Sequence, residues 1–387
     1  MTKYAISDMS GKCKLSRILE EFGPAYVKLG QILACCSDVL PQSYCDELSR
    51  LRTDIKPLAF GDVLKVLENE YGNELDKIFA SISYTPVGSA SLAQVHKATL
   101  LDGSLVAVKI LRPGVRNQMF RNLKFLRKLA CAGKLIPVSK VANPEMIIDE
   151  LKDAAELEFN MHSEMENLKY FRSLNQTGGI SCPRVYEELC TENVLIMEYV
   201  DGIPISEKAM LENNGYDCAK LAERLYMNYA KQILSDGVFH ADPHPGNILV
   251  SSEKIYWIDL GLLGKVSQKN RNYFKDGLKA FIHMDSEALA QVLLNMGGSG
   301  EDVNVSGLAS DIEKMLNICK QEKLEQLELK KLFGDFMSAA KKHGVIMPHE
   351  VSLLTRSMLP LTDTIRKLDL AINPFNILSD VVSEYLT

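Results

Sequence analysis

The sequence of 387 residues lacks the features that mark secreted, membrane-spanning and zinc-binding proteins. Its nine cysteines are an odd number, and no two of them form a CxxC pair. This pattern predicts neither a disulfide framework nor a zinc site, and it favours free thiols in a reducing cytosol. No apolar run approaches the roughly 18 residues of a membrane span, and none begins the chain, so we expect neither a transmembrane helix nor a signal peptide.

A surplus of basic residues is also missing, as are internal repeats and low-complexity segments. The formal net charge of −6 argues against broad nucleic-acid affinity. Hydrophobic residues, by contrast, make up 46% of the chain, which is enough for a large core. The length exceeds one small domain and suits two lobes with an extension.

The stretch from Val238 to Gly261, VFHADPHPGNILVSSEKIYWIDLG, has the most informative pattern in the chain. It begins with an apolar lead-in and continues as a polar loop. Two short strands are predicted after the loop, Ile248 to Val250 and Ile255 to Ile258, separated by a turn. An acidic residue follows the second strand directly.

Three polar residues of this stretch have the spacing of a protein-kinase catalytic centre. Asp242 and Asn247 are five residues apart, and Asp259 follows twelve residues later. In kinases a carboxylate at the first position orients the attacking hydroxyl, while the amide and the second carboxylate hold Mg²⁺ against the phosphates. The alternative is a strand-turn-strand with ordinary turn residues. Three ligand types at matching offsets favour the catalytic interpretation.

A second candidate site precedes this stretch. Leu105 to Leu111, LVAVKIL, predicts a strand with one charge, Lys109, after the hairpin signal Asp102-Gly103. Lys109 either lies on an edge strand, where lysine prevents aggregation, or contacts the α- and β-phosphates of ATP. The small residues Gly88 to Ser91 favour the second interpretation. They form no GxGxxG motif, but they let a backbone approach a nucleotide.

The remaining elements are predicted from periodicity and punctuation. Leu48 and Leu51 are expected in the core, and Gly72 is expected to end a helix. Strands are predicted at Val95 to Leu100, Pro183 to Glu188 and Val194 to Val200, with a small polar segment over Tyr84 to His96. Helices are predicted over residues 15–38 with a break at Gly23-Pro24, and over 42–50, 62–71, 144–175, 216–234 and from 270 onward.

Four blocks together resemble the UbiB/AarF family of atypical protein-kinase-like proteins. They are KLGQ at Lys28 to Gln31, PVGSASLAQVH, an acidic helix at Glu158 to Asn167, and HADPHPGN followed by Asp259-Leu260-Gly261. The likeness extends from about Leu15 to about Phe375. It implies an α+β, two-lobed protein-kinase-like fold. Residues 1–80 would form an N-terminal helical extension with KLGQ, residues 81–200 an N-lobe with an inserted acidic helix, and residues 201–387 a mostly helical C-lobe with the catalytic loop and metal site.

The resemblance also implies roles for individual residues. Lys109 would contact the phosphates and pair with Glu164. Asp242 would take the catalytic-loop role, and Asn247 and Asp259 would bind Mg²⁺. The nucleotide would also contact the small-residue loop and the segment between the lobes, through Gly88, Ser89, Ala90, Ser91, Lys109, Glu198 and Val200.

The KLGQ motif is the feature that separates this family from ordinary kinases. The resemblance implies that Lys28 and Gln31 occupy the space where a protein kinase accepts a peptide. Gly30 would let this helix approach the active site closely. A true protein kinase is therefore the least favoured activity.

The chain departs from the family pattern at several positions. The aspartate of the family's ExD motif is Asn160 here, which removes a negative charge. The alanine-rich loop has Gly88 and Ser89 at its first two alanine positions, which makes it more flexible and more polar. The metal segment contains Leu260 and reads DLG in place of DFG.

The leading interpretation is an ATPase or small-molecule kinase that uses ATP (or ADP) and Mg²⁺ in isoprenoid quinone metabolism, such as ubiquinone biosynthesis, or in other lipid metabolism. A small-molecule phosphotransferase of the aminoglycoside or choline kinase type is the alternative, and a non-catalytic nucleotide-binding scaffold is the third. Expected partners are a nucleotide and a lipid or quinone precursor, with no nucleic acid. We expect a cytoplasmic protein with peripheral contact at the inner membrane face, through amphipathic helices of the extension.

Overall fold

The computed structural model describes most of the chain after residue 55 and separate parts of the segment before it. Packing divides the chain into two compact units, Met1–Met165 with Val185–Tyr199 and Glu166–Arg184 with Val200–Thr387. The functional boundaries expected at residues 80 and 200 remain a prediction. The described residues are 15–23, 26–27, 29–30, 47–48, 51, 56–131, 148–149, 151–152, 155–156, 159–175, 179–299, 303–321, 329–369, 381 and 384.

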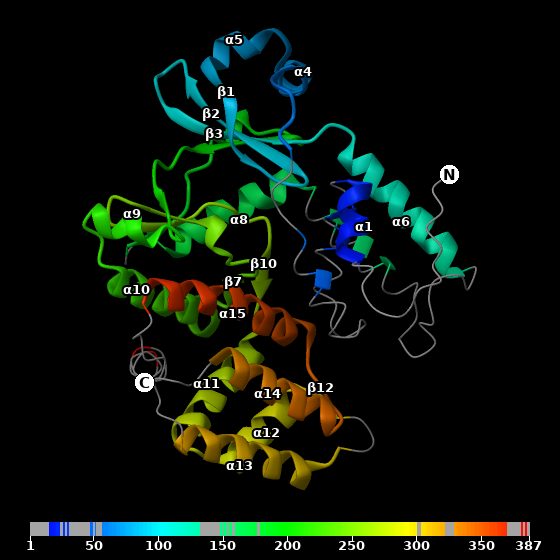
Figure 1. Ribbon diagram of the computed structural model, residues 1–387, viewed down its shortest axis with the longest axis vertical. Helices are drawn as coiled ribbons and strands as arrows, with labels where there is room; N and C mark the ends of the chain where they lie inside the picture. The colour runs from blue at the N-terminus through cyan, green and yellow to red at the C-terminus, as the bar shows by residue number, and fades with distance from the viewer. Residues whose placement is uncertain are drawn as a thin grey trace. The chain divides into compact units, whose positions relative to one another are not determined.

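The first unit contains a four-stranded antiparallel sheet in the order β1-β2-β3-β5 (Figure 1). The strand predicted at Leu105–Leu111 is present as β3, and the predicted turn precedes it: Gly103 has a φ of 85°, and the Ser104 N–H donates to Asp102 Oδ1 at 2.8 Å. The other strands are β1 (Phe79–Ser89), β2 (Ala93–Leu100) and β5 (Val194–Glu198).

The core of the first unit lies between this sheet and helix α4 (Phe60–Tyr71). Alternate residues of β3 point to the same face, so Val106, Val108 and Ile110 are buried together. Val63 and Leu67, four residues apart on α4, pack against them. The helix ends at Gly72 with a φ of 54°, as expected. The unit also contains η1 (Gly72–Glu74), α5 (Leu75–Ile78) and α6 (Val115–Cys131).

Two predicted segments of the first unit differ from the structure. The segment 84–96 was expected as a polar connection, but β1 continues to Ser89 and β2 begins at Ala93. Gln94 and His96 of this segment bond to the Leu58 N–H and to Ser83 O, distant partners that periodicity does not reveal. The strand predicted at Pro183 to Glu188 is wrong. Only Val185 forms an isolated bridge, and a 3₁₀ turn follows at Glu187–Leu189. The turn at Glu187–Leu189 interrupts the extended backbone that a strand needs.

The first described helix of the expected extension is α1 (Leu15–Phe22), which ends at the expected break, where Gly23 has a φ of 100°. Leu48 and Leu51 are buried, as predicted. Gly30 packs against leucines of the extension, and a Cβ there would lie 2.6 Å from Leu19 Cδ1 and nearer still to Leu51. Glycine at position 30 is therefore explained by packing. Lys28 and Gln31 lie outside the described residues.

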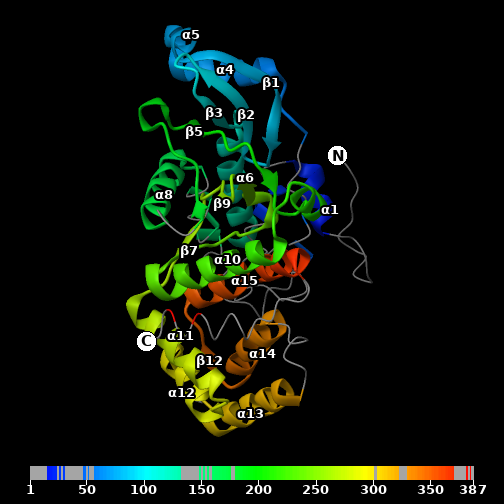
Figure 2. The same cartoon turned by 90° about the vertical axis from the view of Figure 1, so that its left-hand side faces the viewer.

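The second unit holds a small four-stranded sheet in the order β4-β9-β8-β6 beside the long helix α10 (Figure 2). The predicted hairpin is present as β8 (Ile248–Ser251) and β9 (Lys254–Trp257). The helix predicted over 216–234 forms α10 (Cys218–Lys231) and then widens into a π-helical turn, Gln232–Asp236. The remaining short strands are β4 (Ile180–Ser181), β6 (Ile203–Pro204) and the pair β7 (Val238–His240) with β10 (Leu263–Lys265).

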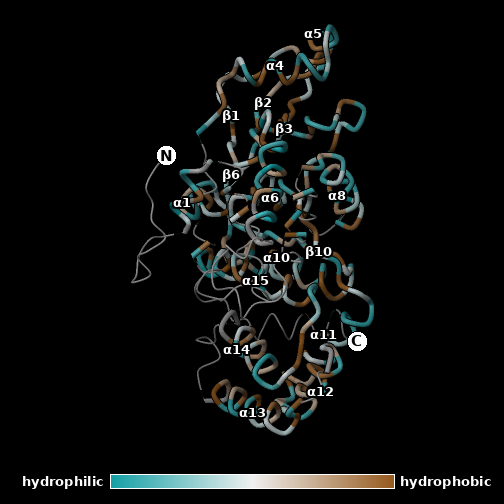
Figure 3. Tube along the Cα trace, turned by 90° about the vertical axis from the view of Figure 1, so that its right-hand side faces the viewer, coloured by the Kyte–Doolittle hydropathy of each residue, from teal (hydrophilic) through white to brown (hydrophobic). Residues whose placement is uncertain are grey.

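The described residues of the second unit after Ser267 are mostly helical, as predicted. Ser267 and Asp285 cap two of the helices with side-chain oxygens that accept backbone N–H groups. Hydrophobic and hydrophilic residues are interspersed along these helices (Figure 3). The apolar faces of the helices between residues 268 and 342 meet in one core. Among the described helices, none is long and apolar enough to span a bilayer. The helices are α9 (Lys208–Asn213), α11 (Gln268–Ile282), α12 (Ser286–Met296), α13 (Val305–Gln321), α14 (Leu329–Lys342) and α15 (His349–Leu368), with a small pair β11 (Gly298–Ser299) and β12 (Val345–Ile346).

Gly264 tests how tightly the strand before the polar loop is packed. It pairs with Phe239, and an added Cβ would overlap the Phe239 ring. Gly264→Ala should therefore lower the free energy of unfolding by about 1–3 kcal/mol. Gly61→Ala is the matched control, because nothing lies within 4 Å of its Cβ position on α4. It should be neutral or stabilising by up to about 1 kcal/mol. Urea unfolding measures both, and equal values would contradict the packing described.

Candidate active site

Lys109 forms a buried ion pair with Glu164. Its Nζ lies 2.6 Å from Glu164 Oε1 and 2.8 Å from Oε2, and the two side chains are only 13% and 7% exposed. Strand β3 lies between β2 and β5, so Lys109 is not on an edge strand. This position excludes the structural alternative considered for Lys109. The pairing expected from the resemblance is present, while the catalytic roles remain a prediction.

Helix α8 (Met161–Leu174) carries Glu164 in its first turn. Asn160 directly precedes this helix, and its Oδ1 accepts the Ser163 N–H at 3.1 Å. An amide oxygen can cap a helix as a carboxylate does. Asn160 can therefore cap this helix as an aspartate would. The first turn of a helix also favours a negative charge, which supports an ionised Glu164. Glu158 lies outside the described residues.

The small-residue loop lies where β1 turns into β2. Ala90 N–H donates to Ala93 O at 2.9 Å and closes the turn. Arg112 fixes the loop from behind, because its Nε donates to Ala90 O at 2.8 Å and its Nη2 to Ser89 Oγ at 2.7 Å. Burial lowers the pKa of Arg112. The serine that departs from the family pattern therefore has a structural partner, and sequence reasoning missed that partner.

Two further polar residues of the same motif have structural contacts. The Gln94 side chain accepts the Leu58 N–H at 2.7 Å through Oε1, and its Nε2 lies 2.8 Å from His96 Nε2. His96 Nδ1 lies 2.8 Å from Ser83 O, so this nitrogen carries the proton and Nε2 accepts from the amide. Burial lowers the pKa of His96. Gln94 and His96 thus tie both hairpin strands to the chain before α4.

In the second unit, Asp242 lies in a loop that its own neighbours hold. Its N–H donates to His240 Nδ1 at 3.1 Å, and its carbonyl accepts the His244 N–H at 2.9 Å and Asn247 Nδ2 at 3.2 Å. His244 Nδ1 accepts the Gly246 N–H at 3.1 Å and caps the 3₁₀ turn Pro245–Asn247. The Asp242 side chain is 58% exposed, so its carboxylate can meet a hydroxyl or a water molecule.

The hairpin of β8 and β9 brings the two predicted metal ligands together. Asn247 directly precedes β8, and its carbonyl accepts the Ile258 N–H at 3.0 Å. Asp259 is the next residue, and its Oδ1 accepts the Gly261 N–H at 3.0 Å. One amide and one carboxylate fit Mg²⁺, which takes few protein ligands and keeps waters and phosphates. The described residues include no cluster of three His, Cys, Asp or Glu side chains suited to a metal.

The other predicted residues occupy less distinctive positions. Glu198 ends β5 opposite Val106, and Val200 is the first residue of the chain after it passes into the second unit. Leu260 is buried, and its carbonyl accepts Asn167 Nδ2 at 2.8 Å. Asn167 therefore anchors the segment that carries Asp259, a role that was not predicted.

The buried ring of His240 makes stability depend on pH. Burial lowers the pKa of His240 from 6.5 to about 4, although Asp242 and Asp259 raise it. Between these two values the unfolded chain binds a proton that the folded protein excludes. The free energy of unfolding should therefore fall as the pH is lowered from 6.5 towards 4, with about 2 kcal/mol lost between pH 7 and pH 5.

Urea unfolding of wild type and His240→Leu at these two pH values isolates this contribution. Other groups titrate in both proteins, so the wild type should lose about 2 kcal/mol more than the variant. Equal losses in the two proteins would show that His240 does not titrate in this window.

Comparisons with known proteins agree with the fold. The model of the ABC1 atypical kinase-like domain matches residues 50–293. An uncharacterised Clostridium pasteurianum protein, named for the 5′ region of hydrogenase 1, is 33% identical over 373 residues, which cover 96% of this chain and 70% of that protein. The probable protein kinase UbiB of Shewanella woodyi is 28% identical over 360 residues, 91% of this chain and 66% of that protein.

The chain thus spans about two thirds of the length of these relatives. A solved structure, the complex of Rv3197 with erythromycin from Mycobacterium tuberculosis, aligns with a TM-score of 0.65 at 22% identity and covers 95% of this chain and 94% of that one. This likeness shows the fold. With the family match over most of its length, the chain belongs to the ABC1 family of atypical kinase-like proteins and has a kinase-like α+β fold.

Proposed function

We propose that this protein binds MgATP or MgADP and acts as an ATPase or a small-molecule kinase. The observation that carries the proposal is the buried ion pair of Lys109 and Glu164. Burying two charges costs several kcal/mol of desolvation, which their attraction only partly offsets. A buried lysine on an inner strand therefore contributes little to stability. A lysine whose ammonium group is fixed by a carboxylate is suited to contact phosphates.

In the proposal each residue has a separate task. Lys109 neutralises charge on the phosphates, and the loop held by Arg112 lies against the nucleotide. Asn247 and Asp259 hold Mg²⁺, which would neutralise further phosphate charge when bound. Asp242 orients the attacking hydroxyl or water and accepts its proton.

The nature of the phosphate acceptor is the finer part of the proposal. We infer a lipid or isoprenoid quinone precursor, because KLGQ is suited to exclude a peptide. ATP hydrolysis by the pure protein, measured with and without liposomes and phenolic quinone precursors, separates the possibilities. Stimulation by either additive supports the inference. Efficient phosphorylation of a peptide or of an aminoglycoside would replace it with a protein kinase or an antibiotic kinase, and nucleotide binding without turnover would indicate a scaffold.

Asp259→Asn tests the metal site. The variant keeps the size of the side chain and removes the charge that Mg²⁺ needs, so it should lose Mg²⁺-dependent nucleotide binding while remaining folded. For the wild type, nucleotide at about 100 times its Kd should add about 2.7 kcal/mol to stability and raise the melting temperature.

Asp276→Asn is the matched control, because it makes the same change of charge at an exposed position of α11. It should show the full shift in melting temperature with MgATP. If Asp259→Asn is stabilised by MgATP as much as this control, Asp259 is not a metal ligand. If the wild type itself shows no shift with either nucleotide, the proposed function is wrong.

A further inference from the structure

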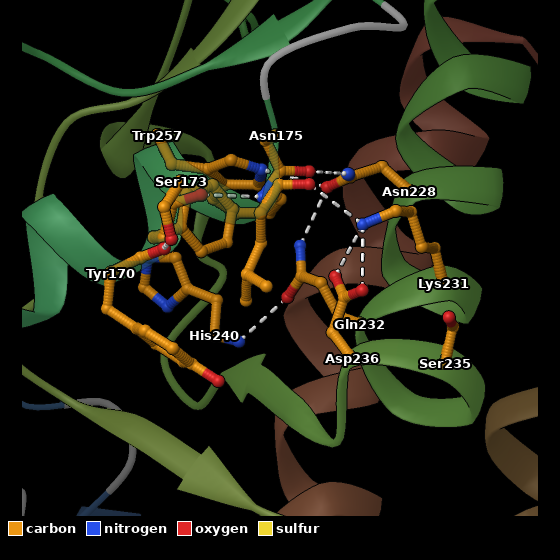
Figure 4. Close-up of polar contacts among 12 residues, drawn as sticks. Tyr170, Ser173, Asn175, Asn228, Lys231, Gln232, Ser235, Asp236, His240 and Trp257 are labelled. Carbon is orange, nitrogen blue, oxygen red and sulfur yellow. Dashed lines mark hydrogen bonds and ion pairs between the residues drawn. The ribbon is translucent and has the colours of Figure 1, made fainter.

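A buried polar network in the second unit (Figure 4) contacts the chain that enters the Asp242 loop, residues 241–247. It begins where α10 widens into the π-helical turn Gln232–Asp236, and such turns are frequent at functional sites. The side chains of Asn228 and Gln232, one turn apart, are almost completely buried there. Buried amides are costly unless every donor and acceptor is used, so their partners are informative.

Gln232 connects the helix to the chain that enters the loop. Its Oε1 accepts the His240 N–H at 2.9 Å, and its Nε2 donates to Asn228 Oδ1 at 2.7 Å. His240 in turn restrains the backbone of Asp242, because its Nδ1 accepts the Asp242 N–H at 3.1 Å. Tyr229 binds the backbone carbonyl of His240, since its hydroxyl donates to His240 O at 2.9 Å. Tyr229 of α10 and Gln232 of the π-helical turn thus fix both backbone groups of His240.

Asn228 joins this chain to the strand that leads to Asp259. Its Oδ1 accepts Gln232 Nε2 and also Trp257 Nε1, the latter at 3.3 Å. Trp257 ends β9, two residues before Asp259. The Asn228 Nδ2 donates to Asn175 Oδ1 at 2.8 Å. Because the His240 N–H and the Trp257 Nε1–H can only donate, only one orientation of each amide satisfies these hydrogen bonds.

An ion pair closes the π-helical turn itself. Lys231 Nζ lies 2.8 Å and 2.7 Å from the two oxygens of Asp236, five residues later, and it also donates to Leu174 O at 3.0 Å. A spacing of five residues matches the i→i+5 step of a π turn. The turn that begins at Gln232 is therefore held at both of its ends.

We propose that Gln232 and Asn228 are positioning residues, which hold the Asp242 loop and the Asp259 segment in fixed relation to each other. This inference rests on the proposed function, in which these two carboxylates act on one nucleotide. Gln232 and Asn228 would not touch the substrate. They would set where the two carboxylates stand, and small displacements of reacting groups cost large factors in rate.

Gln232→Met removes both hydrogen bonds and keeps the length of the side chain. The kcat for ATP hydrolysis should fall roughly 10- to 100-fold, with the Kd for MgADP changed by less than about threefold because Asn247 and Asp259 remain. Backbone hydrogen exchange over residues 238–247 should become faster. Leu221→Ala is the matched control, a buried apolar change on the same helix. It should lower the melting temperature but leave kcat per folded molecule and loop exchange unchanged.

Gln232→Glu provides a conservative rescue with its own signature. The protonated carboxyl can accept from His240 and donate to Asn228, as the amide does, and burial favours this neutral form. Ionisation removes the donor and places a charge beside Asn228 Oδ1. The activity of Gln232→Glu relative to wild type should therefore fall as the pH rises, whereas Gln232→Met should be low throughout.

The outcomes separate this inference from the proposed function. Wild-type kcat and loop exchange in Gln232→Met would overturn the positioning role, as would an equal loss of kcat in Leu221→Ala. A wild type that neither binds nor hydrolyses nucleotide would overturn the proposed function. In that case, faster exchange in Gln232→Met but not in Leu221→Ala would show that Gln232 orders the loop. The inferred catalytic role of that order would still be wrong.

Discussion

The ion pair of Lys109 and Glu164 is the interaction on which the account of the first unit depends. Lys109 Nζ on an inner strand lies 2.6 Å from Glu164 Oε1 in the first turn of a helix, and both side chains are largely buried. The sheet places the lysine, and the cap at Asn160 starts the helix that places the glutamate. A pair of this kind is weak evidence for stability and better evidence for a charged ligand.

In each unit, buried polar side chains hold a segment that is proposed to meet the nucleotide. In the first unit Arg112 fastens the small-residue loop, and Gln94 with His96 fastens the hairpin below it. In the second unit Gln232 and Asn228 hold the chain on either side of the exposed Asp242. Buried hydrogen bonds are strengthened by their low-dielectric surroundings and tolerate little movement, so they suit the task of fixing a loop that must meet a ligand.

The sequence was sufficient wherever local rules decide the structure. Periodicity predicted β3 and α4, the turn Asp102-Gly103 was recognised from its residue types, and kinase spacing singled out Asp242, Asn247 and Asp259. The family resemblance supplied Glu164 as the partner of Lys109, since no local pattern links residues so far apart in the chain.

The sequence was insufficient where polar residues are buried by distant partners. Strand β1 was missed because its second half, Tyr84 to Ser89, looks like a loop until its pairing with β2 is known. Arg112, Asn228 and Gln232 were missed because nothing in the local pattern distinguishes a buried polar side chain from an exposed one. The strand predicted at Pro183 to Glu188 is wrong because a 3₁₀ turn begins at Glu187, which the residue pattern did not indicate.

The central claim is that Lys109 and Glu164 are paired to serve a nucleotide. A double-mutant cycle with Lys109→Met, Glu164→Leu and the double variant tests it most directly, by urea unfolding and ATP hydrolysis. Each single variant removes one charge of the buried pair and should lose about 3–5 kcal/mol, whereas the double variant should regain most of that stability. All three should lose ATP hydrolysis. A double variant that is stable and hydrolyses ATP at the wild-type rate would contradict the claim.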